Sequence, residues 1–184
     1  ITSRYQLFAL AQPEADDAAM RRWIEEIRRV EGPRGPLGNF SEASRLIATA
    51  QKDRQSLTEA RRLIDEAAAQ RPGWNRIFVA KGEIDDIEGR IESAIENYQR
   101  AVELGERREN VIRRLVQLLS ARRRWVEADQ VIRTLEDQSV LPPDLKQIAS
   151  EVSLRLADHT RAIAVAREAV EAAPDNYRNH LWLA

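Results

Sequence analysis

Two histidines and one run of carboxylates are the residues in this sequence whose chemistry could support catalysis or metal binding. His159 and His180 are far apart in the sequence, and His159 follows Asp158 where a helix is expected to begin. We interpret His159 as an exposed neighbour of a helix cap rather than a general base. The segment EIDDIE, residues 83–88, contains four carboxylates but lacks the ligand spacing and the glycine of an EF-hand calcium loop. A solvated helix face explains this segment better than a cation site.

Motifs of the common catalytic and cofactor sites are absent from the sequence. It contains no HExxH zinc motif, no phosphate-binding P-loop, no GxSxG nucleophile motif and no GxGxxG dinucleotide motif. It also contains no cysteine, which excludes disulfides and thiolate metal sites. We therefore expect no catalytic residue, no metal and no cofactor, and we predict that the chain is not an enzyme.

The composition is typical of a folded helical protein. Of the 184 residues, 43% are hydrophobic and 32% are charged, and there are only seven glycines and seven prolines. The net charge of −1 provides no overall attraction to nucleic acid or to a membrane surface, so we expect neither as a partner. The composition does not distinguish a cytoplasmic from a periplasmic location.

A 34-residue period runs through most of the sequence. Alanine recurs at this interval, and seven residues after each of these alanines stands a second small or aliphatic residue. The four columns are Ala60, Ala94, Ala128 and Ala162; Ala67, Ala101, Leu135 and Ala169; Ile64, Tyr98, Ile132 and Ala166; and, twelve residues upstream, Ala48, Gly82, Val116 and Ser150. Small residues at fixed places let helices pack closely, and a period of this length is typical of stacked helical hairpins.

The pattern predicts two helices in each unit. The first helices are expected over residues 41–54, 75–88, 109–122 and 143–156, and the second helices over 57–70, 91–104, 125–137 and 159–172. Ser56 and Glu59 have the spacing of a capping box, and Asp158 is placed to cap the last of these helices. Pro72 and Pro174 are expected to end second helices.

These residues resemble the tetratricopeptide repeat family. Residues 75–108 carry the family pattern at Phe78, Gly82, Gly89, Ala94, Tyr98 and Ala101, and residues 159–174 match its second helix. The resemblance covers the units 41–74, 75–108, 109–142 and 143–176 and the start of a further helix over 177–184. It implies an all-α fold, a right-handed α-α superhelix (solenoid) of stacked helical hairpins. Departures occur at Ser44 and Lys146, where the family has a large apolar residue, and at Gln51, Asp85 and Ser153, where it has tyrosine.

The first forty residues are less regular. The segment PEADDAAMRRWIEEIRRV has the apolar spacing of a helix opened by Pro13, with Met20, Trp23, Ile24, Ile27 and Val30 on one face. We interpret residues 1–31 as a degenerate repeat whose first helix is clipped, with a non-repeat capping helix as the alternative. Residues 32–40, which include GPRGPLG, are predicted to form a Gly/Pro loop insertion.

The family resemblance implies a concave groove lined by the second, fifth, ninth and twelfth residues of the first helices. The candidate partner-binding residues are Arg45, Thr49, Lys52, Arg76, Val79, Glu83, Asp86, Asn110, Arg113, Gln117, Gln147 and Glu151, with Glu42, Ser120, Asp144 and Leu154 at the same kind of position. Some family members hold a C-terminal carboxylate with a five-residue clamp. Arg45 and Arg114 fit that clamp, whereas Thr49, Ala80 and Asn110 do not, so binding of a chaperone tail is not expected.

Charge is distributed unevenly along the repeats. Residues 83–96 contain six acids and one arginine, and residues 107–124 contain seven arginines and one acid. This pattern is compatible with ion pairing between stacked neighbours, with an acidic peptide as partner, or with self-association. An RNA-binding protein would need a longer basic stripe with stacking aromatics. The four tryptophans, Trp23, Trp74, Trp125 and Trp182, are interpreted as packing residues.

The sequence as a whole predicts a non-catalytic scaffold that binds a partner protein or peptide. Because it ends in an apolar helical pattern, HLWLA, we expect it to be a piece of a longer repeat protein. The alternative is a structural spacer or regulatory segment of a larger enzyme whose catalytic domain lies outside this chain.

Overall fold

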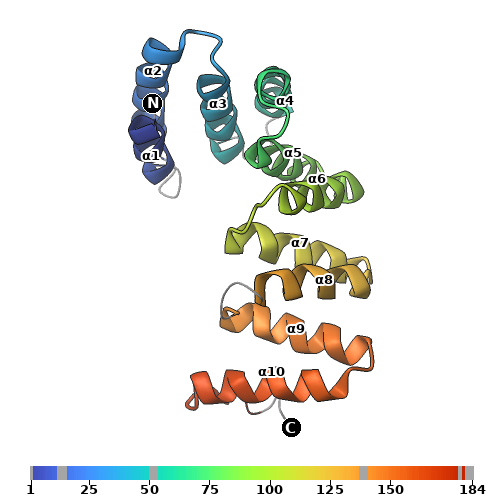
Figure 1. Cartoon of the computed structure of the whole chain (residues 1–184). Helices are drawn as coiled ribbons and strands as arrows, with labels where there is room; N and C mark the ends of the chain where they lie inside the picture. The colour runs from blue at the N-terminus through green and yellow to red at the C-terminus, as the bar shows by residue number, and fades with distance from the viewer. Residues whose placement is uncertain (1, 12–15, 50–53, 137–140, 178–179, 181–184) are drawn as a thin grey trace. The chain divides into compact units, whose positions relative to one another are not determined.

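The computed structural model describes residues 2–11, 16–49, 54–136, 141–177 and 180 (Figure 1). Within these residues the chain forms ten α-helices and no strand. It divides into two compact units, residues 1–106 and 107–184. None of the helices in the described ranges has the length and apolar composition of a membrane span.

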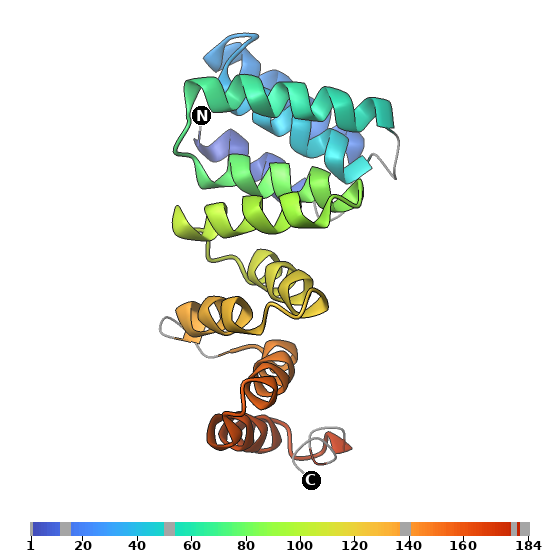
Figure 2. The same ribbon diagram turned by 90° about the vertical axis from the view of Figure 1, so that its right-hand side faces the viewer.

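The N-terminal unit is a stack of six helices, which Figure 2 shows from the side. They are α1 (Thr2–Ala11), α2 (Asp17–Glu31), α3 (Pro36–Thr49), α4 (Arg54–Gln70), α5 (Asn75–Ile87) and α6 (Ile91–Glu103). The helices pack as the hairpins α1–α2, α3–α4 and α5–α6, and α3 also contacts both α1 and α5. The first helices of the three hairpins, α1, α3 and α5, therefore pack side by side in the order in which they occur in the sequence, as in a solenoid.

The C-terminal unit repeats the arrangement with four helices. They are α7 (Glu109–Ala121), α8 (Trp125–Glu136), α9 (Pro143–Arg155) and α10 (His159–Ala172). Each helix packs against the next one, and the two first helices, α7 and α9, also contact each other. The predicted bounds for these helices, and for α5 and α6, agree with the structure to within one residue at every end.

The periodic small residues lie at the helix contacts. Ala60, Ala94 and Ala128 are fully buried and Ala162 is 2% exposed. The residues seven positions later on the same helices are buried as well, and so is Tyr98, between Ala94 and Ala101. These residues are Ala67, Ala101, Leu135 and Ala169. The repeat therefore records a packing requirement, because a larger side chain at these places would separate the helices.

The predicted loop over residues 32–40 is wrong in its extent, because α3 already begins at Pro36. Proline suits the first position of a helix, where its missing N–H is not needed. The Glu31 carboxylate accepts hydrogen bonds from the backbone N–H groups of Leu37 at 2.8 Å and Gly38 at 3.0 Å. The helix is thus capped by a side chain from the end of α2 instead of by a residue of its own first turn.

Helix α3 begins at Pro36, five residues before the predicted start at residue 41, so the positions that face the core are shifted from the predicted ones. Ala48, predicted to face the neighbouring helix, is exposed, while Ala43 is fully buried in the core. The second helix also begins early, at Arg54, so Ser56 lies inside α4 and the predicted capping box is wrong. The Glu59 carboxylate instead binds Arg62 at 2.6 and 2.8 Å.

The first 31 residues contain a hairpin, α1–α2, whose first helix has 10 residues, against 13 in each of α5, α7 and α9. Helix α1 precedes α2, and α2 begins after Asp16, whose carboxylate accepts the N–H of Ala19 at 2.9 Å. Pro13, the predicted start of this helix, lies outside the described residues. Met20, Ile24 and Ile27 are buried, as their spacing predicts. The assignment of this hairpin as a degenerate repeat stays a prediction.

Candidate partner-binding surfaces

The residues with the clearest chemistry serve the fold. His159 is exposed at the start of α10, and the carboxylate of Asp158 caps that helix by accepting the N–H of Arg161 at 3.1 Å, as predicted. His180 contacts the backbone oxygen of Pro174 at 2.7 Å. No group of three His, Cys, Asp or Glu residues in the described part of the chain is arranged to hold a metal ion.

Asp85, in the acidic segment 83–88, is the centre of an ion-pair network. Its side chain is 4% exposed and accepts hydrogen bonds from Arg61 at 2.8 Å, from Arg90 at 2.8 and 3.0 Å, and from Asn97 at 2.8 Å. Burial raises the pKa of the Asp85 carboxyl, but the hydrogen bonds from Arg90 and Arg61 outweigh it and hold the pKa below its usual value. The network joins α4 to α5 and α6, so this carboxylate is structural.

A network of inverted charge occupies the equivalent place in the C-terminal unit. Arg161 of α10 pairs with Asp129, with Glu136 at 2.8 Å, and with the hydroxyl of Ser153 at 3.3 Å. Ser153 is two repeats after Asp85, at the same position of its hairpin. The family departures at Asp85 and Ser153 thus belong to polar contacts that connect successive hairpins.

Several predicted groove residues of α3 are occupied by internal contacts. Arg45 is 6% exposed, and its guanidinium binds Asp17 at 2.5 Å and Glu42 at 2.7 Å. The hydrogen bonds that Arg45 donates to Glu42 and Asp17 raise the pKa of its guanidinium, so this residue remains charged. The Thr49 hydroxyl donates to the backbone oxygen of Arg45 at 2.9 Å. Lys52 lies outside the described residues.

The predicted groove residues of α5 are similarly engaged. The guanidinium of Arg76 lies 4.8 Å from the ring centre of Tyr5 and hydrogen-bonds its hydroxyl, so a residue of α1 covers it. Val79 is 3% exposed and belongs to the core. Glu83 and Asp86 are half-buried and already interact within the chain. In the N-terminal unit, therefore, few of the candidate residues face solvent.

The C-terminal unit presents the corresponding residues to solvent. Asn110 and Gln117 of α7 and Gln147 and Glu151 of α9 are all exposed. Arg113 is half-buried and pairs with Glu109. Of the further positions, Ser120 is half-buried, Leu154 is 49% exposed, and the side chain of Asp144 is not described. We call the set Asn110, Arg113, Gln117, Gln147 and Glu151 the α7–α9 face.

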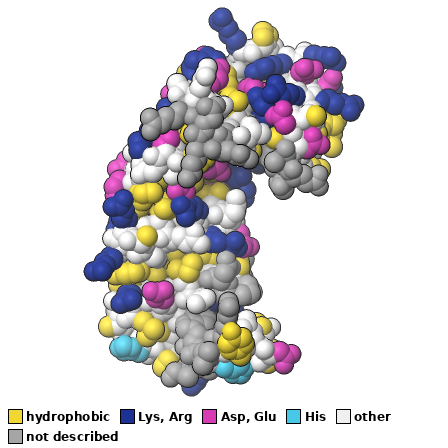
Figure 3. Space-filling model, turned by 180° about the vertical axis from the view of Figure 1, so that it is seen from behind, with side chains coloured by type: hydrophobic (Ala, Val, Ile, Leu, Met, Phe, Trp, Pro, Cys, Tyr) yellow, Lys and Arg dark blue, Asp and Glu magenta, His cyan; other side chains and the backbone are white. Residues whose placement is uncertain are grey.

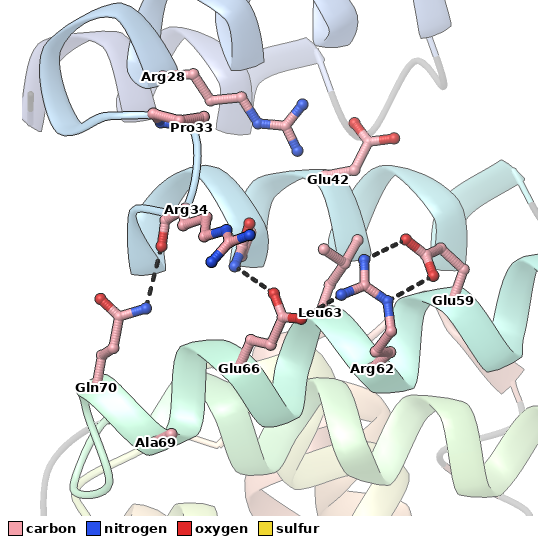
Figure 4. A pocket seen from close by; sticks show the side chains of 11 residues that line it. Arg28, Pro33, Arg34, Glu42, Glu59, Arg62, Leu63, Glu66, Ala69 and Gln70 are labelled. Atoms are coloured by element: carbon pink, nitrogen blue, oxygen red, sulfur yellow. Dashed lines mark hydrogen bonds and ion pairs between the residues drawn. The ribbon is translucent and has the colours of Figure 1, made fainter.

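A pocket that the sequence did not predict lies in the N-terminal unit (Figure 4). It has a volume of about 820 Å³ and is formed by the end of α2, the α2–α3 loop, α3 and α4. Its lining residues are Arg28, Pro33, Arg34, Asn39, Glu42, Glu59, Arg62, Leu63, Glu66, Ala69 and Gln70. Basic and acidic side chains are interspersed over this unit, at the top of Figure 3. Arg28 and Arg34 were not among the candidate partner-binding residues predicted from the sequence, which all come from the first helices of later repeats.

Comparison with known proteins gives a structural likeness and no sequence match. No protein-family model matches the sequence, and no curated protein matches it. A repeat protein of Cytophaga hutchinsonii, solved as its C-terminal part and described as containing tetratricopeptide repeats, superposes with a TM-score of 0.66 at 15% identity, over 97% of this chain and 68% of that one. YrrB, a tetratricopeptide repeat protein described as having an unusual peptide-binding site, gives 0.61 at 14% identity, over 96% and 88%.

A third match is a chain of the APC/C hetero-tetramer Cut9–Hcn1, with a TM-score of 0.65 at 14% identity. The match covers 91% of this chain but only 31% of that one, so this chain spans about a third of its length. Together with the stacked hairpins and the buried small residues, these likenesses confirm the predicted all-α solenoid. The chain has the fold of the tetratricopeptide repeat proteins.

Proposed function

We propose that the chain is a non-catalytic scaffold that binds a segment of a partner protein on the α7–α9 face. The observation that supports this proposal is the exposure of the Asn110 and Gln147 side chains and their lack of hydrogen-bond partners in the described part of the chain. Both side chains are exposed on neighbouring first helices, and neither has a hydrogen-bond partner within the described residues. The equivalent surface of the N-terminal unit is instead engaged by Asp17 and Tyr5.

The chemistry of this face suits a peptide backbone. A carboxamide has both a donor and an acceptor group, so it can bind the N–H and the C=O of an extended segment. Gln117, about two turns after Asn110, and Glu151, about one turn after Gln147, extend the polar surface along each helix. Arg113 lies between Asn110 and Gln117 and is paired with Glu109. Such a face would hold the main chain of a partner, while the neighbouring charged groups would select its side chains.

The likeness to YrrB supports a peptide as the bound species, because that protein is described as having a peptide-binding site on the same fold. An interaction role also agrees with the structural role of Asp85. Whether the chain also self-associates stays a prediction.

Affinity isolation followed by a direct binding measurement tests the proposal. The tagged chain is used to isolate partner proteins from a lysate of the source cells, and each candidate is then purified. Its dissociation constant is measured for the wild type, for Asn110→Ala/Gln147→Ala, and for a control variant, Gln130→Ala, on the exposed surface of α8. Circular dichroism checks that all three chains are folded.

We expect the double variant to bind the partner about tenfold or more weakly, since each lost hydrogen bond contributes roughly 0.5–1.5 kcal/mol. The control variant should bind as the wild type does. An unchanged dissociation constant for the double variant would remove the α7–α9 face from consideration. A chain that isolates no specific partner would favour the structural spacer.

A further inference from the structure

The carboxylates that line the pocket between α2, α3 and α4 are already paired. The guanidinium of Arg62 binds both oxygens of Glu59, at 2.6 and 2.8 Å, and also binds Glu66 (Figure 4). These hydrogen bonds lower the pKa of the Glu59 carboxyl, so Glu59 is ionised at neutral pH. Glu42 is paired with Arg45 at 2.7 Å. Each of the three glutamates of the pocket wall therefore has a guanidinium partner within the protein, although Glu59 and Glu66 share the single cation of Arg62.

Two cations of the same pocket have no such compensation. Within the described residues, the guanidinium groups of Arg28 and Arg34 have no hydrogen-bond or ion-pair partner, and the Nε atom of Arg28 is buried without one. A buried donor without a partner costs roughly 1–3 kcal/mol and is uncommon in folded proteins. Figure 4 shows Arg28 reaching from above toward α3 and Arg34 reaching along it, both on the pocket side.

The backbone around these two arginines is held in place. The side chain of Arg28 packs against Gly38, where an added Cβ atom would lie 3.0 Å from its Cγ atom. The backbone oxygen of Arg34 accepts a hydrogen bond from Gln70 at 3.0 Å, which ties the loop to the end of α4. Glu31, the last residue of α2, fixes the start of α3. The loop that carries Arg34 and the stem of Arg28 are thus held in place, while the side chain of Arg34 itself is exposed.

We propose that Arg28 and Arg34 bind the carboxylate of an acidic segment of a partner protein in this pocket. Guanidinium groups bind carboxylates through paired N–H donors, and two of them supply enough donors for both oxygens. Because Glu59 and Glu66 share one cation, the wall keeps a residual negative charge, which favours a ligand group with one negative charge over a dianion such as phosphate. Leu63, which is buried, and Ala69, which is exposed, are the apolar residues that α4 contributes to the pocket lining. The volume of about 820 Å³ is within the range of pockets that hold ligands of a few residues.

This inference rests on the proposed scaffold function but concerns a second surface, in the other unit of the chain. The charge pattern of the sequence left open whether the partner is acidic. The pocket predicts an acidic group in the partner, at the place that contacts Arg28 and Arg34. The pocket is formed by the hairpin contacts of α2, α3 and α4.

Binding of a defined acidic peptide tests the inference. The probe is a short fluorescein-labelled peptide in which glutamate alternates with glycine, and the matched probe has glutamine in place of glutamate. Fluorescence anisotropy gives the dissociation constants for the complete chain, for Arg28→Gln/Arg34→Gln, and for a control with the same change in net charge, Arg29→Gln/Arg100→Gln. Arg29 and Arg100 are exposed, and among the residues that the structure describes they pair only with Glu26 and Glu103 on their own helices. Inorganic phosphate is added as a competitor, and thermal melting checks that each variant is folded.

We expect the wild type and the control to bind the acidic probe with similar affinity, and the pocket variant to bind it about tenfold or more weakly. The glutamine probe should not bind. Equal weakening of the pocket variant and the control would show a non-specific charge effect and would overturn the inference, as would competition by phosphate at concentrations below that of the probe. No binding of the acidic probe to the wild type would also overturn it.

The outcome can be separated from that of the proposed function. If Asn110→Ala/Gln147→Ala loses the acidic probe while the pocket variant retains it, the pocket inference is wrong and the α7–α9 face is supported. If the pocket variant alone loses the probe while the partner of the α7–α9 experiment binds all variants equally, the pocket is supported and the proposed face is wrong.

Discussion

Gly82 of α5 and the ring of Tyr98 of α6 are in such close contact that a Cβ atom at position 82 would lie 2.7 Å from Cε1 of the tyrosine. Real Cβ atoms essentially never approach that closely, so the two residues determine each other's size. Tyr98 is 3% exposed and lies between the fully buried Ala94 and Ala101. The glycine of one helix and the alanines of the next thus make room for one ring, which explains why small residues alternate with a large one in this repeat.

The first prediction follows from this contact. Gly82→Ala should destabilise the chain, because overpacking costs about 1–3 kcal/mol while the better helix propensity of alanine returns about 1 kcal/mol or less. In a Tyr98→Leu background the same substitution should be neutral or stabilising, because the ring is gone. Urea denaturation of the four chains of this double-mutant cycle measures the coupling. Additive effects would mean that the two side chains do not meet as described.

The register of α3 gives a second prediction. Ala43→Leu should destabilise the chain by about 1–3 kcal/mol, since Ala43 is fully buried against the α4 helix. Ala48→Leu should change the stability by less than about 0.5 kcal/mol, because Ala48 is exposed. The two variants differ only in position along one helix, so their melting temperatures compare the observed register directly with the one that a strict 34-residue period implies. If Ala48→Leu were the less stable of the two variants, the register implied by the strict 34-residue period would be correct and the observed one wrong.

A third prediction concerns the pH dependence of the Asp85 network. Because the folded pKa of Asp85 is below its ordinary value of 3.8, its ionised form stabilises the chain above that pH, and the contribution disappears as the pH falls through the folded pKa. Asp85→Asn should therefore be less stable than the wild type at pH 7, by about 1–3 kcal/mol for the charged hydrogen bonds. The difference should shrink below pH of about 4. Denaturation curves from pH 3 to pH 7 measure it, and a difference that is constant with pH would show that the carboxylate charge is not responsible.

A fourth prediction concerns Lys146, whose replacement by leucine should not lower the stability of the chain. It is 6% exposed and its Nζ atom lies 3.1 Å from Glu168, at a position where related repeats have a large apolar residue. Lys146→Leu should leave the stability unchanged or increase it by up to about 1 kcal/mol, because desolvating the ammonium offsets its ion pair and Glu168 remains in contact with water. Lys146→Ala should instead destabilise by about 1 kcal/mol or more, since it removes the packed side-chain stem. A loss of stability in both variants would indicate that the ion pair itself is needed.

The sequence predicted the helices best where the repeat is uninterrupted. From residue 75 to residue 172 the expected bounds agree with the structure to within one residue, because the small and large positions recur at the same spacing in every hairpin. The prediction was wrong at residues 32–56. There, local rules for proline and glycine favoured a loop, whereas the cap of α3 comes from Glu31, across the turn that precedes it. Rules for proline and glycine alone do not show which carboxylate of the preceding helix will reach a free N–H group.

The candidate site was predicted less well than the fold. The family positions placed Arg45 and Arg76 in a groove, but Asp17 and Tyr5 from the first hairpin occupy both side chains. Arg45 and Asp17 are separated by 28 positions in the sequence, and Arg76 and Tyr5 by 71 positions, so no spacing within one repeat reveals these contacts. The pocket at Arg28 and Arg34 was missed for the same reason, because its wall is assembled from three helices and a loop.

Site-specific crosslinking is the most direct test of the central proposal, that a partner binds on the α7–α9 face. The chain contains no cysteine, so a single cysteine can be introduced at Gln147 of α9 or, as the control, at Gln130 of α8, and labelled with a benzophenone maleimide. Both positions are exposed. The labelled chains are irradiated with the purified partner. We predict a crosslinked adduct from position 147 and none from position 130, whereas equal adducts from both positions, or an adduct from position 130 alone, would contradict binding on this face.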